Sequence, residues 1–197
     1  MNTLFTCAIV YFLIAVSIYR VKSTLITTGN KKGRISHAWT LYILTFLHIL
    51  VGVVAIIEYF YRVTHINYLI TAIGLVSFTI GVTGRFWALN TLGKYHSPQI
   101  EIREDQPLIT SGPYRYMRHP IYFFTIFEVL GCALIPNAFL AFLIALCAYT
   151  PLLLYRLLLE EKTLMQTFGS AYLKYKETVP CLIPFSKRPK HGFIINE

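Results

Sequence analysis

Polar side chains capable of chemistry are concentrated in one short stretch of this chain, residues 111–122. Within these twelve residues lie three tyrosines, two arginines and a histidine: Tyr114, Tyr116, Tyr122, Arg115, Arg118 and His119. A basic, aromatic belt at a membrane surface would have the same composition. Such a belt needs no Gly112-Pro113 turn, however. The His119-Pro120 pair also suits the first turn of a helix, whose free N–H groups can meet an anion. Both interpretations stay open, an interfacial belt and a binding site.

A second polar group lies where an apolar run ends, at Arg156 and the adjacent pair Glu160 and Glu161. On a helix, Arg156 and Glu160 could form an ion pair worth roughly 0.3–0.5 kcal/mol if exposed. Arginine before glutamate is the less favourable order for the helix dipole. Neighbouring residues on a helix point about 100° apart, so the two carboxylates cannot serve one partner equally. One of them could pair with an arginine while the other faces a cationic ligand.

Ionisable residues also occur inside the apolar runs, with Arg85 in one run and Glu128 in another. Such side chains cost roughly 2.5–3.5 kcal/mol at the centre of a membrane helix, so they are functional candidates. The alternatives are that Arg85 reaches the nearby interface and that Glu128 pairs with it or stays protonated. We interpret His48 as an interhelical hydrogen-bonding residue and Glu58 as an interfacial charge.

The elements that must position these side chains are membrane helices. Hydrophobic residues make up 55% of the 197 residues and charged residues only 14%, with a mean hydropathy of +0.56. A soluble domain carries about 25% charged residues, and a membrane-spanning helix needs about 20 apolar residues. The apolar runs therefore predict an all-α integral membrane protein, a single membrane domain over residues 1–197. Its five transmembrane helices are expected at about 3–20, 38–58, 66–88, 121–135 and 138–158.

The distribution of Lys and Arg predicts the orientation of these helices. Segments 21–37, 89–120 and 159–197 hold most of the 18 Lys and Arg residues, whereas the segments on the opposite side hold only Arg62. We therefore expect the N-terminus outside the membrane and the C-terminus in the cytoplasm. The formal net charge of +9 is then a topology signal, and it does not indicate a nucleic-acid partner.

Two of the cytoplasmic segments are predicted to form the binding site. The loop at residues 89–120 is rich in turn-forming Gly and Pro, and residues 160–177 have an apolar stripe that predicts an amphipathic helix. The sequence has no glycine-rich phosphate loop, HExxH motif, nucleophile elbow or set of Cys and His ligands. We therefore expect a pocket for a polar cofactor and a lipophilic substrate, with no metal. Residue spacing alone names no reaction.

The motifs resemble the signature of the isoprenylcysteine carboxyl methyltransferase family: Gly112-Pro113-Tyr114, Arg118-His119-Pro120-Ile121-Tyr122 and Glu160-Glu161. The similarity covers about residues 92–184, and the chain is similar in length to the compact prokaryotic members with five spans. One difference is Phe124, which stands where the family often has glycine. We expect this phenylalanine to change local packing and the shape of the substrate site.

The resemblance implies S-adenosylmethionine as the cofactor and S-adenosylhomocysteine as its product. It also implies a methyl ester formed on the carboxylate of a prenylated cysteine or a similar lipophilic acid, whose chain enters sideways from the membrane lipid. A carboxylate is already ionised at neutral pH, so the reaction needs alignment and exclusion of water rather than a general base.

The implied roles fall on residues already singled out. We expect Arg156 to orient the acceptor carboxylate, with Arg85 approaching from its own helix, and we place Glu128 in the same catalytic group. Glu161 is favoured over Glu160 for binding the cofactor's amino group or ribose. The whole implied cofactor site consists of His96, Tyr114, Arg118, His119, Pro120, Tyr122, Glu160 and Glu161.

Three other functions stay open. Phospholipid N-methyltransferases share the signature loosely, and an amine acceptor needs a base, for which Glu128 or Glu160 could serve. Sterol reductases share it too, but they need a nicotinamide cofactor, for which this chain has little polar surface. A non-catalytic membrane protein could retain the motif as a structural corner. The expected location is the plasma membrane in a prokaryote or the endoplasmic reticulum in a eukaryote, in an oligomeric state that the sequence leaves open.

Overall fold

The computed structural model describes residues 3–25, 34–62, 65–102 and 106–184, and most of these residues are helical. The predicted all-α class is confirmed for them. The helices are α1 (Thr3–Leu25), α2 (Ala38–Tyr61), α3 (Tyr68–Leu92), α4 (Pro120–Leu134), α5 (Phe139–Ile144), α6 (Thr150–Phe168) and α7 (Ser170–Thr178). Shorter helical turns are η1 (Gly93–Tyr95), η2 (Gly112–Arg115) and the π-helical η3 (Ala145–Tyr149), which joins α5 to α6.

One element was not predicted, a pair of short antiparallel strands. Strand β1 (Arg34–Ser36) pairs with β2 (Ile100–Ile102), with Ile35 opposite Glu101. The two strands belong to two segments that were both predicted to be cytoplasmic. Their backbone pairing joins the segment before α2 to the loop after α3.

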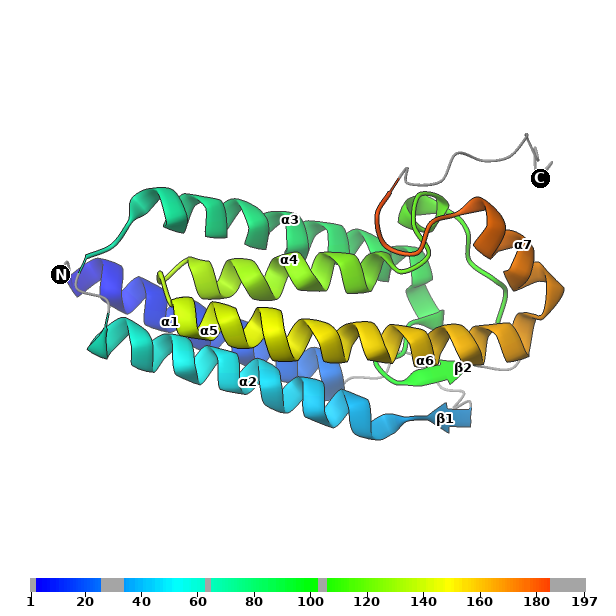
Figure 1. Cartoon of the computed structure of the whole chain (residues 1–197), viewed down its shortest axis with the longest axis horizontal. Helices are drawn as coiled ribbons and strands as arrows, with labels where there is room; N and C mark the ends of the chain where they lie inside the picture. The colour runs from blue at the N-terminus through cyan, green and yellow to red at the C-terminus, as the bar shows by residue number, and fades with distance from the viewer. Residues whose placement is uncertain (1–2, 26–33, 63–64, 103–105, 185–197) are drawn as a thin grey trace.

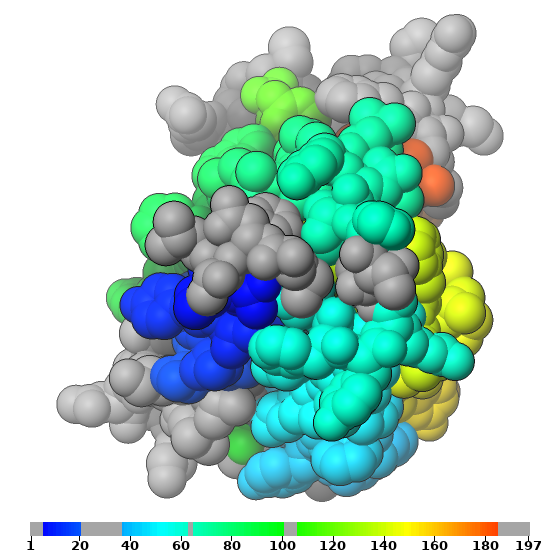
Figure 2. All heavy atoms as spheres, turned by 90° about the vertical axis from the view of Figure 1, so that its left-hand side faces the viewer, coloured from blue at the N-terminus to red at the C-terminus, as the bar shows by residue number. Residues whose placement is uncertain are grey.

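The long helices run side by side along the long axis of the molecule (Figure 1). Helix α7, the turn η2 and the strand pair gather at one end, whereas the N-terminus lies at the other. Seen from that other end, the atoms of α2 and α3 lie between α1, in blue, and the yellow helix of α5 and α6 (Figure 2). The polar motifs of the second half of the chain therefore meet at one end of a helical bundle.

Three helices of the described part of the chain are long and apolar enough to cross a membrane, at Ala38–Tyr61, Tyr68–Tyr95 and Phe139–Phe168. Two further apolar helices, Thr6–Arg20 and Pro120–Leu134, are shorter. At about 1.5 Å per residue, the 15 residues of α4 fall short of a hydrocarbon layer about 30 Å thick. All five predicted segments are thus helical, and the crossing of the membrane by the two shorter ones stays a prediction. The predicted cytoplasmic segments lie partly outside the described residues, at 26–33, 103–105 and 185–197.

The predicted amphipathic helix at residues 160–177 is wrong in its boundaries. The last apolar helix continues without a break to Phe168, because residues 152–168 contain neither Gly nor Pro. Gly169 then adopts φ 51° and separates α6 from α7, a backbone conformation that glycine accepts without strain. Glu160 and Glu161 therefore lie on the same rigid helix as Arg156.

Helices α3 and α4 pack with their backbones in contact, because both present glycine at the interface. A Cβ atom at Gly131 of α4 would lie 2.5 Å from the backbone nitrogen of Phe78 on α3. A Cβ atom at Gly74 of α3 would lie 2.7 Å from the backbone nitrogen of Ile135. The same interface holds Arg85 of α3 and Glu128 of α4.

We predict that Gly131→Val destabilises the fold, because the added side chain would overlap the backbone of α3. Overpacking of this kind typically costs about 1–3 kcal/mol. The free energy of unfolding should be measured by SDS titration of the protein in mixed micelles. Thr79→Val, on an exposed part of α3, is the control and should change that free energy little; equal losses in both variants would contradict the packing argument.

Candidate active site

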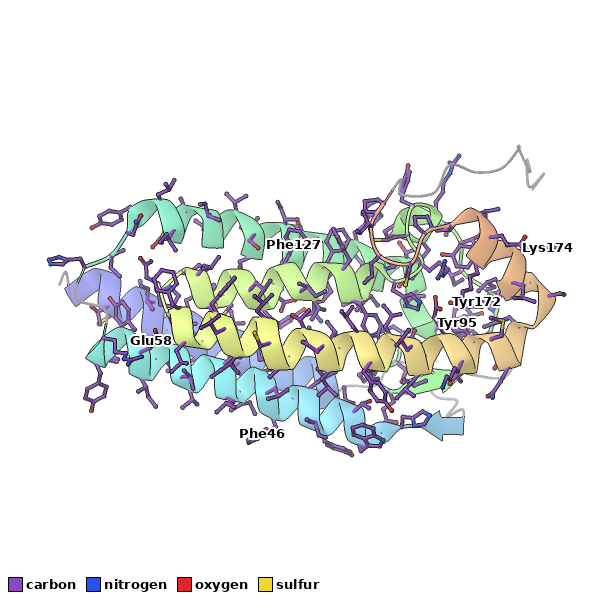
Figure 3. All side chains as sticks on the ribbon, viewed as in Figure 1. Phe46, Glu58, Tyr95, Phe127, Tyr172 and Lys174 are labelled. Atoms are coloured by element: carbon purple, nitrogen blue, oxygen red, sulfur yellow. The ribbon has the colours of Figure 1, made fainter. Side chains whose placement is uncertain are left out.

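A cavity of about 230 Å³ lies where the bundle meets the loop after α3 and the helix α7. Tyr95 and Tyr172 lie at this end of the bundle, whereas Lys174 lies on the outer side of α7 and Glu58 at the opposite end (Figure 3). Most of the residues that the sequence predicted for the site line this one cavity: Arg85, His96, Tyr114, Arg118, His119, Pro120, Tyr122, Arg156 and Glu160. Glu128 and Glu161 are not among the lining residues. The structure therefore brings together residues from α3, α4, α6 and two loops.

Arg156 is buried in the cavity wall, where it contacts Thr40 and Pro98 and lies within hydrogen-bonding reach of the Tyr122 hydroxyl. Its Nη1 donates to Thr40 Oγ1 on α2 at 2.5 Å, and its Nη2 donates to the carbonyl oxygen of Pro98 at 2.7 Å. Neither partner is a carboxylate, so these contacts leave the guanidinium's positive charge available to an anion in the cavity. The ion pair between Arg156 and Glu160, which the sequence left open, is not among the contacts within 4.0 Å in the described residues.

Glu160 lines the cavity one helical turn beyond Arg156. The hydroxyl of Tyr122, on the first turn of α4, donates to its Oε2. Tyr122 is in turn buried against His119, whose ring packs edge-on at a centroid distance of 5.7 Å. The signature residues of α4 and α6 thus contact each other, with the carboxylate of Glu160 directed to the cavity.

Glu161 points away from the cavity into a buried clamp. Its Oε1 accepts from Arg118 Nε at 2.9 Å and Nη2 at 2.6 Å, and lies 3.3 Å from His119 Nε2. Its Oε2 accepts from Lys176 Nζ of α7 at 3.1 Å. Arg118 also donates to the carbonyl oxygen of Val179 at 2.6 Å. The clamp therefore joins α6, the 111–122 stretch and α7, and of the two glutamates only Glu160 faces the cavity.

The clamp shifts the pKa values of the groups around it. Burial works against a charged Arg118, but the hydrogen bond and the charge of Glu161 outweigh it and raise the pKa of the guanidinium. Burial and the charge of Glu161 raise the pKa of the Tyr172 phenol and of the Cys181 thiol. At neutral pH the clamp is therefore an arginine beside a carboxylate, with its phenol and thiol neutral.

One group of potential metal ligands occurs in the described part of the chain, formed by His119, Glu161 and Cys181. Their ligand atoms lie within 4.8 Å of one another. Glu161 Oε1 is already 2.6 Å from the guanidinium of Arg118, and Lys176 is bound to the other oxygen. Two positive charges at these distances would repel a metal cation. The three residues lie close together because they belong to the clamp or contact it.

Tyr114 places an unsatisfied hydroxyl at the cavity. The side chain is 8% exposed, and its oxygen has no hydrogen-bond partner among the described residues. Burial, and then the charges of Glu160 and Tyr175, raise the pKa of this phenol well above its usual value. A buried hydroxyl without a partner costs free energy, so the geometry favours a polar ligand beside it.

Arg85 and Glu128 form a buried ion pair at the inner end of the cavity, with Nε and Oε2 2.9 Å apart. Their side chains are 7% and 1% exposed. Of the alternatives that the sequence left open, the structure shows Glu128 paired with Arg85, which reaches across the α3–α4 interface. Glu128 lies behind the cavity wall and does not line the cavity, so the structure does not support its predicted place in the catalytic group.

The sequence analysis did not identify Arg20 of α1, which also lines the cavity. Its Nη1 lies 3.7 Å from Glu128 Oε2, and its Nη2 donates to Tyr149 Oη at 3.3 Å and Thr125 Oγ1 at 3.4 Å. Arg20 directly follows an apolar run, at the end of the first predicted helix, and was given no role in the site. Thr40 and Pro98 were missed because neither residue type indicates a partner for arginine.

Phe124 packs against a glycine of the neighbouring helix. Its ring occupies the space where a Cβ atom of Gly84 would lie. The expected change in local packing is thus localised to the α3–α4 interface. The absence of a side chain at position 84 makes room for the ring.

Comparison with known proteins shows what this chain is similar to. Residues 72–166 match the sequence model of the isoprenylcysteine carboxyl methyltransferase (ICMT) family. The chain is 33% identical over 119 residues to protein-S-isoprenylcysteine O-methyltransferase B of Arabidopsis thaliana, covering 59% of this chain and 60% of that one. It is also 33% identical over 82 residues to the uncharacterized protein YpbQ of Bacillus subtilis, covering 42% of this chain and 49% of that one.

A comparison with solved structures finds a similar fold in a protein of the same name. A solved structure of the eukaryotic intramembrane Ras methyltransferase ICMT matches 79% of this chain and 56% of its own length, with a TM-score of 0.63 and 28% identity. This chain spans about half the length of the curated relatives that it matches. The motifs, the matched segment and the common fold agree, and this chain is an integral membrane protein related to the isoprenylcysteine carboxyl methyltransferase family.

Proposed function

We propose that this protein is an S-adenosylmethionine-dependent carboxyl O-methyltransferase. Its product would be a methyl ester on the carboxylate of a prenylated cysteine or a similar lipophilic acid. The observation that carries the proposal is the cavity, in which Arg156 meets no carboxylate of the described residues while Glu160 faces the same space. An acceptor carboxylate and a cationic cofactor complement these two charges. The named function of the relatives supports the same chemistry.

The residues of the cavity fit the proposed cofactor. Glu160 offers a carboxylate to an amino group or ribose, and the unpartnered hydroxyl of Tyr114 offers a donor and an acceptor. His119 and Tyr122 give an aromatic wall, and His96 lines the side formed by the loop after α3. Arg118 and Glu161 support this wall from behind through the clamp. When bound, S-adenosylmethionine supplies a methyl group on a positively charged sulfur.

The protein's contribution to the reaction is alignment in a dry site. Arg156 is fixed by Thr40 and Pro98, so its guanidinium can present two parallel N–H groups to the acceptor carboxylate without reordering. Removal of water strengthens this pairing and leaves the carboxylate oxygen poorly solvated and reactive. The acceptor is already ionised, so the mechanism requires no side chain to take a proton.

The position of the site at one end of the bundle also supports a proposal for how the helices are oriented in the membrane. We propose that all five apolar helices lie in the membrane, with the N-terminus outside and the cavity at the cytoplasmic face. The signature residues gather at the end of the bundle from which η1, η2 and α7 extend (Figure 1). Those segments carry Lys and Arg, as cytoplasmic segments do. The acceptor's lipid chain would then reach the cavity sideways from the bilayer.

Amine methylation is not favoured as an alternative. Two of the relatives are named protein-S-isoprenylcysteine O-methyltransferases. An amine acceptor would need a base, and Glu128 is held by Arg85 behind the cavity wall. Glu160, the other proposed base, already accepts a hydrogen bond from the Tyr122 hydroxyl.

The proposal is tested by radiolabelled methyl transfer to a farnesylated cysteine analogue, with purified protein in liposomes. The product is then treated with mild base. Label released as methanol identifies a carboxyl methyl ester and supports the proposal. Base-stable label would indicate methylation at nitrogen, and transfer to phosphatidylethanolamine instead of the acid would replace the proposal with its alternative.

A further inference from the structure

The inner end of the cavity carries neutral polar side chains although it lies among membrane helices. His48 of α2, Thr125 of α4 and Tyr149 of η3 all line it. We call these three residues the inner polar site. His48 precedes residues 72–166, the segment that matches the family model, so that match assigns this histidine no role.

The imidazole of His48 is buried without a hydrogen bond at one of its nitrogens. The residue is 5% exposed, and its Nδ1 has no hydrogen-bond partner in the described part of the chain. His48 was predicted to hydrogen-bond to another helix; instead its ring packs edge-on against Tyr149, with centroids 6.2 Å apart. Buried polar groups are nearly always satisfied. Because the ring lines a cavity, water or a polar atom of a ligand can supply the hydrogen bond.

Two hydroxyl groups beside His48 have protons to offer. Thr125 Oγ1 and Tyr149 Oη each accept from Arg20 Nη2, at 3.4 and 3.3 Å. An oxygen that accepts can still donate its own proton, and within the described ranges neither hydroxyl donates to another residue. Arg20 and Arg85 both lie close to the carboxylate of Glu128, so a neutral occupant leaves those contacts unchanged.

A wide turn of the helix keeps Tyr149 on the cavity wall. Pro151 has no N–H to continue the α-helical pattern, and the backbone N–H and the hydroxyl of Thr150 both donate to the carbonyl oxygen of Ala145, five residues earlier. The buried residues Ala145, Tyr149 and Leu153 follow one another at intervals of four. A regular helix would rotate such a series by about 40° per step, and the wide turn reduces this rotation between Ala145 and Tyr149. Turns of this kind are frequent at functional sites.

The inner polar site lies deeper in the bundle than the proposed reacting position. Tyr149 precedes Arg156 by seven residues along one helical run, and Thr40, which contacts Arg156, precedes His48 by eight residues on α2. At about 1.5 Å per residue, both helices place the two levels about 10–12 Å apart. The apolar side chains that line the cavity between these levels include Leu44 and Leu153. A ligand that reaches both levels therefore needs a polar group at each end of an apolar chain.

We propose that the inner polar site binds a hydroxyl group on the lipophilic chain of the methyl acceptor, with His48 as a specificity-determining residue. This inference rests on the proposed function, and it narrows the acceptor to lipophilic acids with a hydroxyl about 10 Å from the carboxylate. A hydroxyl both donates and accepts, so it can accept from Thr125 or Tyr149 and bond to His48 in either tautomer. A plain hydrocarbon chain would leave these buried groups unsatisfied, at a cost in free energy.

The test compares straight-chain acids with and without a hydroxyl at the far end. The three pairs are hexanoic and 6-hydroxyhexanoic acid, decanoic and 10-hydroxydecanoic acid, and tetradecanoic and 14-hydroxytetradecanoic acid. Ten carbons joined by bonds of about 1.5 Å make an extended chain that spans the two levels. Dissociation constants are measured by calorimetry with the purified protein in detergent and saturating S-adenosylhomocysteine, which has no methyl group to transfer.

The quantity compared is the ratio of the two dissociation constants within each pair. A hydroxyl changes partition into detergent similarly in all three pairs, so this effect cancels between them. We expect the ten-carbon pair to favour the hydroxy acid about tenfold more than the other two pairs do, because only this hydroxyl reaches the buried polar groups. A ratio that is equal in all three pairs, as expected if the site holds only water, would overturn the inference.

Variants assign the preference to the inner polar site. His48→Leu and Tyr149→Phe should each remove the tenfold advantage of the ten-carbon pair. His65→Leu, at an exposed histidine outside the cavity, is the matched control and should keep the wild-type ratios. Gel filtration and melting temperature identify any variant that fails to fold, and the other variant then decides the question. An advantage that survives in the folded variants would place the hydroxyl elsewhere and overturn the inference.

The outcome is separable from that of the proposed function, because labelled methyl transfer is measured on the same preparations. Transfer to the farnesylated cysteine analogue with no advantage for 10-hydroxydecanoic acid would leave the carboxyl methyltransferase standing without an inner polar site for the acceptor. A tenfold advantage in binding with no transfer to either acid would support the site and contradict the proposed reaction.

Discussion

Arg156→Ala should lower kcat/KM for the acid acceptor by roughly a hundred- to a thousandfold, the loss expected when a charged group that aligns the reacting atoms is removed. The affinity for S-adenosylmethionine should largely survive, because Arg156 contacts Thr40 and the carbonyl of Pro98 rather than Glu160 or Tyr114. The measurements are initial rates of labelled methyl transfer and the dissociation constant of the cofactor. Arg156→Lys should recover part of the rate, because a lysine retains the charge but not the two-pronged geometry.

The control for this prediction is Arg115→Ala. Arg115 belongs to the same stretch as the signature residues but is exposed, so its loss should leave both quantities close to the wild-type values. If Arg156→Ala reduced cofactor affinity as much as the rate, the arginine would belong to the cofactor site instead. An unaltered rate would remove Arg156 from the mechanism.

Glu161→Gln should destabilise the end of the bundle at which α6, α7 and the 111–122 stretch meet. The glutamine cannot neutralise Arg118, which would then be a buried cation with only carbonyl partners. Breaking a buried ion pair costs about 3–5 kcal/mol, and we expect about 3 kcal/mol because Lys176 remains partly exposed. SDS titration gives this loss. The reaction of Cys181 with iodoacetamide should also become faster, because the charge of Glu161 is one cause of its raised thiol pKa.

Glu177→Gln is the matched substitution, on an exposed position of α7, and it should change neither stability nor thiol reactivity. A Glu161→Gln protein of unchanged stability would show that the clamp is not a major source of folding free energy. Loss of cofactor affinity without any loss of stability would return Glu161 to the cofactor site, the role that the sequence analysis favoured.

The helices were predictable because each membrane helix corresponds to a long apolar run in the sequence. The region of the site was predictable too, since charged residues are costly in a membrane protein and stand out around 111–122 and 156–161. The different roles of Glu160, which faces the cavity, and Glu161, which lies in the clamp, were not predictable from the sequence. They depend on where α7 places Lys176 and on how Val179 and Pro180 return to Arg118, and no spacing along the chain contains that information.

Arg20 shows the same limit in a different way. Its position at the end of an apolar run is equally consistent with an interfacial anchor and with a residue of the cavity. The decision comes from α1 packing beside α4, where Glu128 and Thr125 face it. The break at Gly169 was predictable only in part. Glycine marks a possible helix end, but α6 reaches this glycine only because no earlier Gly or Pro interrupts it.

The ring of Phe124 against Gly84 has a consequence for how this pair varies among homologues. The distance between α3 and α4 is fixed by backbone contact at Gly74 and Gly131, so the space that positions 84 and 124 share is constant. A large residue at one position requires a small one at the other. Covariation between these two columns of a family alignment should therefore be inverse in size, and position 84 becomes free to enlarge in chains where position 124 is glycine.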